Sequence, residues 1–170
     1  MIKPLTTPVR SRKPASGFTL MELLVVIAIV GILAAVAVPS YFRQIEKGYR
    51  TDAQGALTGF AQAMERHYTV NGTYLGAEVG ASDPPTDVTT NTAPTVYFTS
   101  SPVDGGTPIY DLFIAEATST TYSLVAVPRG DSRMDGDGAL AISHTGAKFW
   151  DKDDNGSYED SGEDCWEHSC

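Results

Sequence analysis

Basic residues are scarce in this chain once its first 17 residues are set aside. The sequence of 170 residues holds 12 Lys and Arg against 21 Asp and Glu. The first 17 residues contain four of the cations and no acid, which leaves 12 − 4 = 8 basic against 21 acidic residues. Nucleic-acid binding needs a basic face. The acidic body therefore argues against a direct nucleic-acid site.

Signatures of catalysis are also lacking. The three histidines, His67, His144 and His168, are scattered along the chain, and no nucleophile motif or phosphate-binding glycine loop is present. We therefore expect that the protein is not an enzyme. The only cofactor that the sequence suggests is a cation, which the acidic C-terminal segment could hold.

Long apolar runs are confined to one segment, residues 18–38, whose 21 residues include a single charge. A helix of that length spans roughly 31 Å, close to the thickness of a bilayer core. Residues 1–17 are basic, contain three prolines and lack an apolar period, which is typical of a targeting leader. The positive-inside rule then predicts a cytoplasmic N-terminus, with the rest of the chain beyond the inner membrane.

Glu22 is the residue that an ordinary signal peptide or a plain membrane anchor does not explain. A carboxylate in the hydrocarbon costs about 2.5 to 3.5 kcal/mol, and no Lys or Arg lies in residues 18–38 to offset it. Cleavage after Gly17 would create a partner, the α-amino group of Phe18. In neighbouring chains offset along a fibre, this amine and Glu22 could meet at low dielectric. The pattern therefore predicts that Glu22 sets the register between subunits.

The segment Gly17-Phe18-Thr19-Leu20-Met21-Glu22, between a basic leader and an apolar run, resembles the class III signal of type IV pilins and type II secretion pseudopilins. This resemblance implies that a prepilin peptidase cuts between Gly17 and Phe18 and methylates Phe18, and that Glu22 acts in assembly. The implied partners are other pilin subunits, the peptidase, inner-membrane lipid and the pilus assembly machinery.

An amphipathic helix is predicted to continue past Pro39, because apolar residues recur every three or four positions up to Tyr68. The helix should begin near Phe18 and be kinked at Pro39. A loop is expected over 71–108, with a short strand at 96–98, followed by β-rich strands at 109–116, 121–128, 139–143 and 147–150. The predicted fold is α+β, with a four-stranded antiparallel sheet packed on the helix.

Three further stretches, MERHYTVNGTYLGA, TTYSLVAVPRGD and LAISHTGAK, resemble PilE-type minor pilins. The implied organisation is a leader at 1–17, a transmembrane and assembly half-helix at 18–38, and a periplasmic globular domain at 39–170. The implied function is a minor subunit of a type IV pilus, stored in the inner membrane and then displayed outside the cell for adhesion, twitching motility or DNA uptake. The alternative is a type II secretion pseudopilin, although the Pro-Trp-Gly motif frequent there is absent.

The chain departs from the resembled family just before the third predicted strand. Members often have a cysteine there, paired with one near the C-terminus, whereas this chain has Asp137 and Gly138. Cys165 and Cys170 are the only cysteines. An oxidising compartment favours pairing them, while metal binding together with His168 is the weaker alternative.

An acidic C-terminal loop begins at Asp151 and contains a D-x-D-x-N-G core. Oxygen ligands at alternate positions, with a glycine for the turn, suit Ca²⁺, although the glutamate that would close an EF-hand loop is one position late. The alternative is a solvated acidic turn. The predicted calcium ligands are Asp151, Asp153, Asn155, Ser157 through its carbonyl, and Asp160 or Glu163.

Overall fold

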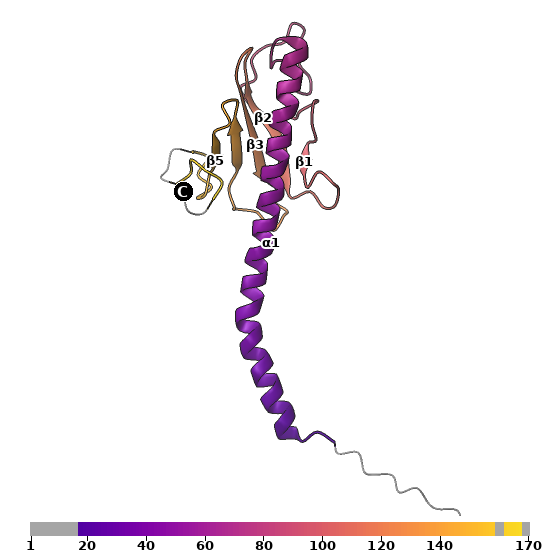
Figure 1. Ribbon diagram of the computed structural model, residues 1–170, viewed down its shortest axis with the longest axis vertical. Coiled ribbons are helices and arrows are strands. Elements are labelled where there is room, and N and C mark those ends of the chain that lie inside the picture. Colours follow the sequence, from indigo (N-terminus) through magenta and orange to yellow (C-terminus); the bar gives the residue numbers. More distant parts are fainter. Residues whose placement is uncertain (1–16, 159–161, 168–170) are drawn as a thin grey trace, which may run out of the picture. The chain divides into compact units, whose positions relative to one another are not determined.

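The computed structural model describes residues 17–158 and 162–167. Its contacts divide into two units, unit 1 ending at Tyr41 and unit 2 beginning at Phe42. One helix, α1 (Leu20–Asn71), contributes residues to both units, and the five strands belong to unit 2 (Figure 1). The combination of one long helix with an antiparallel sheet confirms the predicted α+β pilin fold.

Helix α1 continues through Pro39, as the apolar spacing predicted. The kink at Pro39 stays a prediction. The helix ends where Asn71-Gly72 indicated. Gly72 has a φ of 71°, in the left-handed region that glycine adopts without a steric cost, and its N–H donates to the carbonyl of Tyr68 at 2.8 Å.

The sheet has five strands rather than four. They follow chain order, each antiparallel to the next: β1 (Ser100–Ser101), β2 (Tyr110–Ala117), β3 (Tyr122–Pro128), β4 (Leu140–Ser143) and β5 (Lys148–Trp150). The four predicted strands correspond to β2 to β5 within one or two residues. The short strand expected at 96–98 was misplaced, because β1 begins at Ser100 and pairs with Asp111 and Tyr110.

Residues 96–98, which do not form a strand, lie against α1 through Tyr97. Its ring stacks on Phe60 of α1, with the ring centroids 5.4 Å apart and the planes 7° from parallel. A Cβ at Gly59 would overlap the Tyr97 hydroxyl, so the missing side chain at Gly59 lets this ring lie on the helix. The segment is therefore held by a side-chain contact with α1 rather than by strand pairing.

The core of unit 2 lies between the second half of α1 and one face of the sheet (Figure 1). α1 contributes Leu57, Phe60 and Met64, all fully buried, and these residues follow one another at helical spacing. Opposing them are fully buried sheet residues on alternating positions: Leu112 and Ile114 from β2, Leu124 and Ala126 from β3, and Leu140 from β4.

A buried ion pair fixes α1 to the segment that precedes β4. Arg50 is 8% exposed, and its Nε donates to Asp137 Oδ2 at 3.0 Å. Asp137 also accepts the hydroxyl of Tyr110 at 3.1 Å, and its backbone carbonyl accepts Trp150 Nε1 at 2.8 Å. The Arg50 guanidinium lies 4.2 Å from the centre of a Trp150 ring. Asp137 and Gly138 stand just before β4, where the pilin resemblance implies a cysteine, and in this chain the ion pair of Asp137 holds the segment.

Candidate functional sites

The N-terminus of α1 is closed by a reciprocal pair of side chains, Thr19 and Glu22. The Glu22 carboxylate accepts hydrogen bonds from the backbone N–H and the hydroxyl of Thr19, both at 2.8 Å. The N–H of Glu22 in turn donates to Thr19 Oγ1 at 3.2 Å. This is a capping box, in which each side chain satisfies a backbone donor of the first helical turn. The T-x-x-E spacing was visible in the sequence, and our sequence reasoning overlooked it.

The first half of α1 is exposed along its whole length. Phe18 is 85% exposed, and the most apolar stretch of the helix has none of its residues buried. Length and composition allow this helix to cross a membrane. Gly17 is likewise exposed at the edge of the described residues, so the predicted cleavage bond between Gly17 and Phe18 lies just before the capping box.

Asp151 organises the acidic loop immediately after β5. Its two carboxylate oxygens accept the N–H groups of Asn155 and Gly156, each at 2.9 Å. Asp153 accepts both the backbone and the side-chain N–H of Asn155, at 3.3 and 3.0 Å. Gly156 has a φ of 81°. The loop therefore turns back around the Asp151 carboxylate, which is held beside the end of the sheet.

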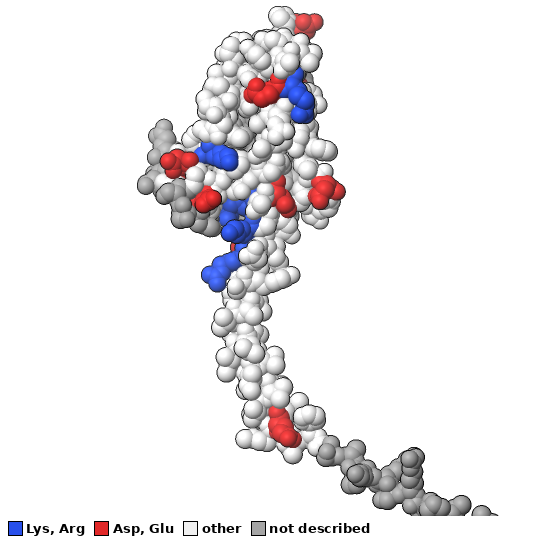
Figure 2. Space-filling view, viewed as in Figure 1, with Lys and Arg blue, Asp and Glu red and all other residues white. Residues whose placement is uncertain are grey.

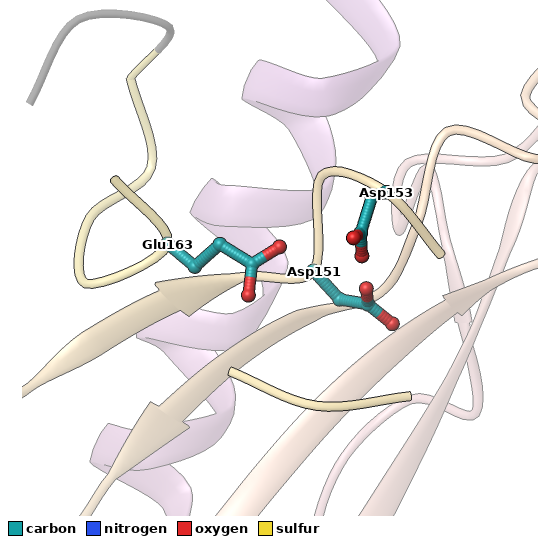
Figure 3. A group of neighbouring side chains, drawn as sticks. All are labelled: Asp151, Asp153 and Glu163. Atoms are coloured by element: carbon teal, nitrogen blue, oxygen red, sulfur yellow. The ribbon is translucent and has the colours of Figure 1, made fainter. Parts of the chain in front are cut away.

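Glu163 brings a third carboxylate to the same place from a later part of the chain (Figure 3). Its Oε1 accepts the N–H of Lys152 at 2.8 Å, and its backbone carbonyl accepts the N–H of Trp150 at 2.9 Å. One ligand oxygen from each of Asp151, Asp153 and Glu163 lies within 4.8 Å of the others. Calcium–oxygen distances of about 2.3 to 2.6 Å put opposite ligands at most about 5 Å apart, so the spacing fits one ion.

The burial of two of these carboxylates supports a cation. Asp151 is 3% exposed and Glu163 is 2% exposed. Glu163 Oε2 is buried and has no hydrogen-bond partner among the described residues, and an unpaired buried charge is costly. Burial, and then the charges of Asp151 and Glu163, raise the pKa of Tyr158 to about 12. An oxygen-only donor set with this charge suits Ca²⁺ better than softer transition metals.

The structural support for the other predicted calcium ligands is less direct. The side-chain oxygen of Asn155 accepts the N–H of Ser157 at 2.7 Å, which shapes the turn. Asp160 lies outside the described residues, so of the two residues proposed to close the loop, the structure brings Glu163 to the cluster. The roles of Asn155, Ser157 and Asp160 as ligands stay predictions.

The segment 162–167 is attached to the sheet through Trp166, which sequence reasoning did not single out. Trp166 is 9% exposed, and its indole N–H lies 3.1 Å from the carbonyl oxygens of both Ala141 and Phe149. The amide of Gln54 on α1 donates to the Trp166 carbonyl at 3.1 Å. Cys170 lies outside the described residues, so its pairing with Cys165 stays a prediction.

A long helix with an exposed apolar half, followed by an antiparallel meander, is the architecture of a type IV pilin. Residues 12–38 match the prokaryotic N-terminal methylation motif. Residues 39–139 match the family described as type IV minor pilin ComP, DNA uptake sequence receptor. Because this match covers more than half of the chain, the chain belongs to that family.

Individual relatives match over shorter stretches. The type IV major pilin protein PilE1 of Neisseria gonorrhoeae is 39% identical over 74 residues, which are 42% of this chain and 45% of that protein. The type II secretion system core protein G of Pseudomonas aeruginosa is 36% identical over 69 residues, 41% of this chain and 49% of that protein. The chain thus matches less than half the length of either relative.

Among solved structures, the non-core minor pilin PilV of Neisseria meningitidis aligns with 68% of this chain and 94% of its own. The sequence identity is 15% and the TM-score is 0.46.

Proposed function

We propose that this chain is a minor subunit of a type IV pilus. Residues 18–38 hold the precursor in the inner membrane. A prepilin peptidase cuts between Gly17 and Phe18 and methylates Phe18. The assembly machinery then extracts the subunit into a surface fibre that serves adhesion, motility or DNA uptake. This proposal gives residues 39–170 the role of the exported globular domain.

The observation that carries this proposal is the exposed apolar half of α1, with a carboxylate at its start. Among the described residues, nothing covers this half-helix, and exposed apolar area of this extent requires a lipid or protein partner. A bilayer covers it in the precursor. Neighbouring copies of the half-helix cover it in a fibre, through contacts that repeat without closing.

The first test addresses processing. We expect Gly17→Ala to leave the full-length precursor in the membrane, because the residue before the cut is changed while the helix is not. Immunoblotting of membrane fractions will separate precursor from mature chain, with Ser16→Ala as a neighbouring control that should be processed. Normal cleavage of Gly17→Ala would refute the assigned bond.

The second test addresses the register between subunits. We expect Glu22→Gln to be processed but excluded from the fibre, because the α-amino group of a neighbouring chain would lose its charged partner. Quantitative blotting of sheared fibres measures incorporation. Glu46→Gln, an acid of the same helix in unit 2, is the control. Wild-type incorporation of Glu22→Gln would remove the role of Glu22 in register.

The alternative assembly is a type II secretion pseudopilus. The match to the core protein G of P. aeruginosa is the observation that favours testing it. Cross-linking of this chain to the major pilin in sheared fibres supports a pilus. Loss of exoprotein secretion on deletion of the gene, with surface fibres intact, supports a pseudopilus.

Direct reception of DNA is not the activity that we propose, although the family description names it. Unit 2 has 21 − 1 = 20 acidic and 12 − 4 = 8 basic residues. Such an excess of negative charge over unit 2 as a whole disfavours binding of an extended phosphate backbone. A role in DNA uptake is therefore assigned through the fibre rather than through a DNA site on this subunit.

We also propose that Asp151, Asp153 and Glu163 bind one Ca²⁺ ion, with oxygens of Asn155, Ser157 and Asp160 as further ligands. Glu163 Oε2, which is buried and has no hydrogen-bond partner among the described residues, supports this most directly. The ion would join the start of the acidic loop to segment 162–167, and a disulfide between Cys165 and Cys170 would close the chain end beyond it. The role of the ion is therefore structural.

A further inference from the structure

Three cations follow one stripe of α1 at the start of unit 2. Arg43, Lys47 and Arg50 are spaced i, i+4 and i+7, so they lie on the same face of the helix. Arg50 is buried and paired with Asp137, whereas Arg43 and Lys47 are exposed. The stripe thus has one neutralised member inside the fold and two free charges toward its N-terminal end.

A distant loop adds a fourth cation to this end. Arg133 lies between β3 and β4, and its guanidinium carbon is 4.4 Å from the ring centre of Phe42, the first residue of unit 2. The ion pair between Arg50 and Asp137 attaches the same loop to α1. Arg133 is itself exposed. Figure 2 shows blue side chains gathered along α1 at this end of unit 2.

These exposed charges are not neutralised within the part of the chain that the structure describes. The ion pairs there engage Arg50 and Arg129, and Arg43, Lys47 and Arg133 have no carboxylate within ion-pair distance. Of the acids near these cations in the sequence, Asp137 and Asp131 are paired with Arg50 and Arg129, which leaves Glu46 and Asp135 against three cations. The net charge of this end is therefore less negative than that of unit 2 as a whole. An anionic partner would therefore approach unit 2 most favourably at this end.

We propose that Arg43, Lys47 and Arg133 form a cationic collar that binds the phosphates of anionic phospholipids while the precursor is stored in the membrane. The proposal rests on the proposed membrane anchor at 18–38. Arg43 follows Val38 by five residues, so the chain keeps it within about 18 Å of the end of the apolar run. Under the proposed topology the collar faces the periplasmic leaflet, where basic residues near the surface attract the anionic headgroups that this leaflet contains, and Arg presents a donor fork that matches phosphate.

The lipid is favoured over a soluble anion because of where the collar lies in the sequence. Arg43 and Lys47 follow the apolar run within nine residues of Val38, and Arg133 is brought beside Phe42 by the loop that Arg50 holds. The collar would orient the stored subunit with its acidic remainder away from the anionic surface. Extraction into a fibre would release the lipid contact.

The test uses the full-length chain in detergent micelles, titrated with dioleoyl phosphatidylglycerol or dioleoyl phosphatidylcholine. Native mass spectrometry counts the bound lipid. We expect preferential binding of phosphatidylglycerol, weakened about fivefold for each collar charge removed. The variant Arg43→Gln with Lys47→Gln should lose the preference. The matched control, Arg66→Gln with Lys148→Gln, removes the same two residue types elsewhere in unit 2 and should keep it. Arg133→Lys should retain binding that Arg133→Gln weakens.

Equal binding of the two lipids by the wild-type chain would overturn the collar, as would an equal loss in the control pair. Displacement of phosphatidylglycerol by inorganic phosphate at matched concentration would overturn the lipid assignment. The fibre-incorporation assay does not depend on the preference for phosphatidylglycerol. A negative result for the collar would therefore not contradict the proposal that the chain is a pilus subunit. A chain that fails to insert into micelles or vesicles would overturn both the anchor and the collar.

Discussion

Glu22 and Arg50 lie on the same helix, and each is a charge beside apolar residues, yet they are satisfied in opposite ways. Glu22 is exposed and bonded to Thr19, three positions before it. Arg50 is buried and bonded to Asp137, 87 positions after it. The first arrangement is complete within one helical turn and leaves the apolar half of α1 open to partners. The second exists only when the sheet has folded, so it connects α1 to the rest of unit 2.

The largest effect is expected at the long-range pair. Arg50→Met should lower the free energy of unfolding of unit 2 by about 3 kcal/mol or more, because it leaves Asp137 charged and poorly solvated. The Asp137 side chain is 18% exposed, so water relieves only part of this cost. Tryptophan fluorescence of the full-length chain in detergent, followed against urea, measures the change.

The control for this prediction is Arg43→Met, the same substitution at an exposed site on the same face of α1. It should change the free energy of unfolding by no more than about 0.5 kcal/mol. Removing both partners, as Arg50→Met with Asp137→Leu, should recover much of the loss, because no unpaired charge remains. If the double variant is no more stable than Arg50→Met alone, the pair is not the interaction that Arg50 supplies.

The carboxylate cluster proposed to bind calcium combines both kinds of contact and should give the next largest effect. Asp151 and Asp153 are neighbours in the sequence, while Glu163 comes from beyond the loop. Calcium at a hundred times its dissociation constant should stabilise unit 2 by about 2.7 kcal/mol. Glu163→Gln should abolish most of that gain, and Glu167→Gln, a nearby acid outside the cluster, should not. A melting temperature unaffected by calcium or chelator would contradict the site.

Tyr158 offers a second test of the same ion. Its pKa, raised to about 12 by burial and then by the charges of Asp151 and Glu163, should fall when calcium neutralises those carboxylates. Part of the rise should remain, because burial is its larger cause. A raised pKa means that the folded state holds the phenol proton of Tyr158 more tightly than the unfolded chain does. Below pH 10 this difference stabilises the folded state fully, and the stabilisation is lost as the pH rises through about 12. Titration of the tyrosine Cζ resonances by NMR, with Tyr158→Phe for assignment, measures the shift.

The difference between local and long-range contacts also explains what could be predicted from the sequence. The helix and β2 to β5 follow from spacing and composition, which are local. The processing motif follows from the resemblance of residues 17–22 to the pilin signal, which is also a local pattern. The T-x-x-E cap was equally local and could have been predicted. The Arg50–Asp137 pair could not, because nothing in the sequence around residue 50 distinguishes a buried arginine from an exposed one on an amphipathic helix.

The acidic C-terminal segment could be predicted from the sequence only in part. The proposed ligands Asp151 and Asp153 follow from their alternate spacing, whereas the place of Glu163 in the cluster depended on how the chain returns to β5. The position of β1 was missed for a similar reason. A strand of two residues carries no pattern of its own, and its place is set by pairing with β2 and by the contact of Tyr97 with α1.

The smallest effect is expected at the helix cap, and it separates two roles of Glu22. Thr19→Val removes the hydroxyl that bonds Glu22 but keeps the carboxylate. Loss of such a cap costs about 1 kcal/mol, so the amides of the first turn should exchange with deuterium several times faster in detergent micelles. Incorporation into fibres should persist, because Glu22 can still meet the α-amino group of a neighbouring chain. Thr19→Ser retains the hydroxyl and serves as the control. If Thr19→Val is excluded from fibres as completely as Glu22→Gln, then the start of the helix, rather than a pair between chains, is what assembly requires of Glu22.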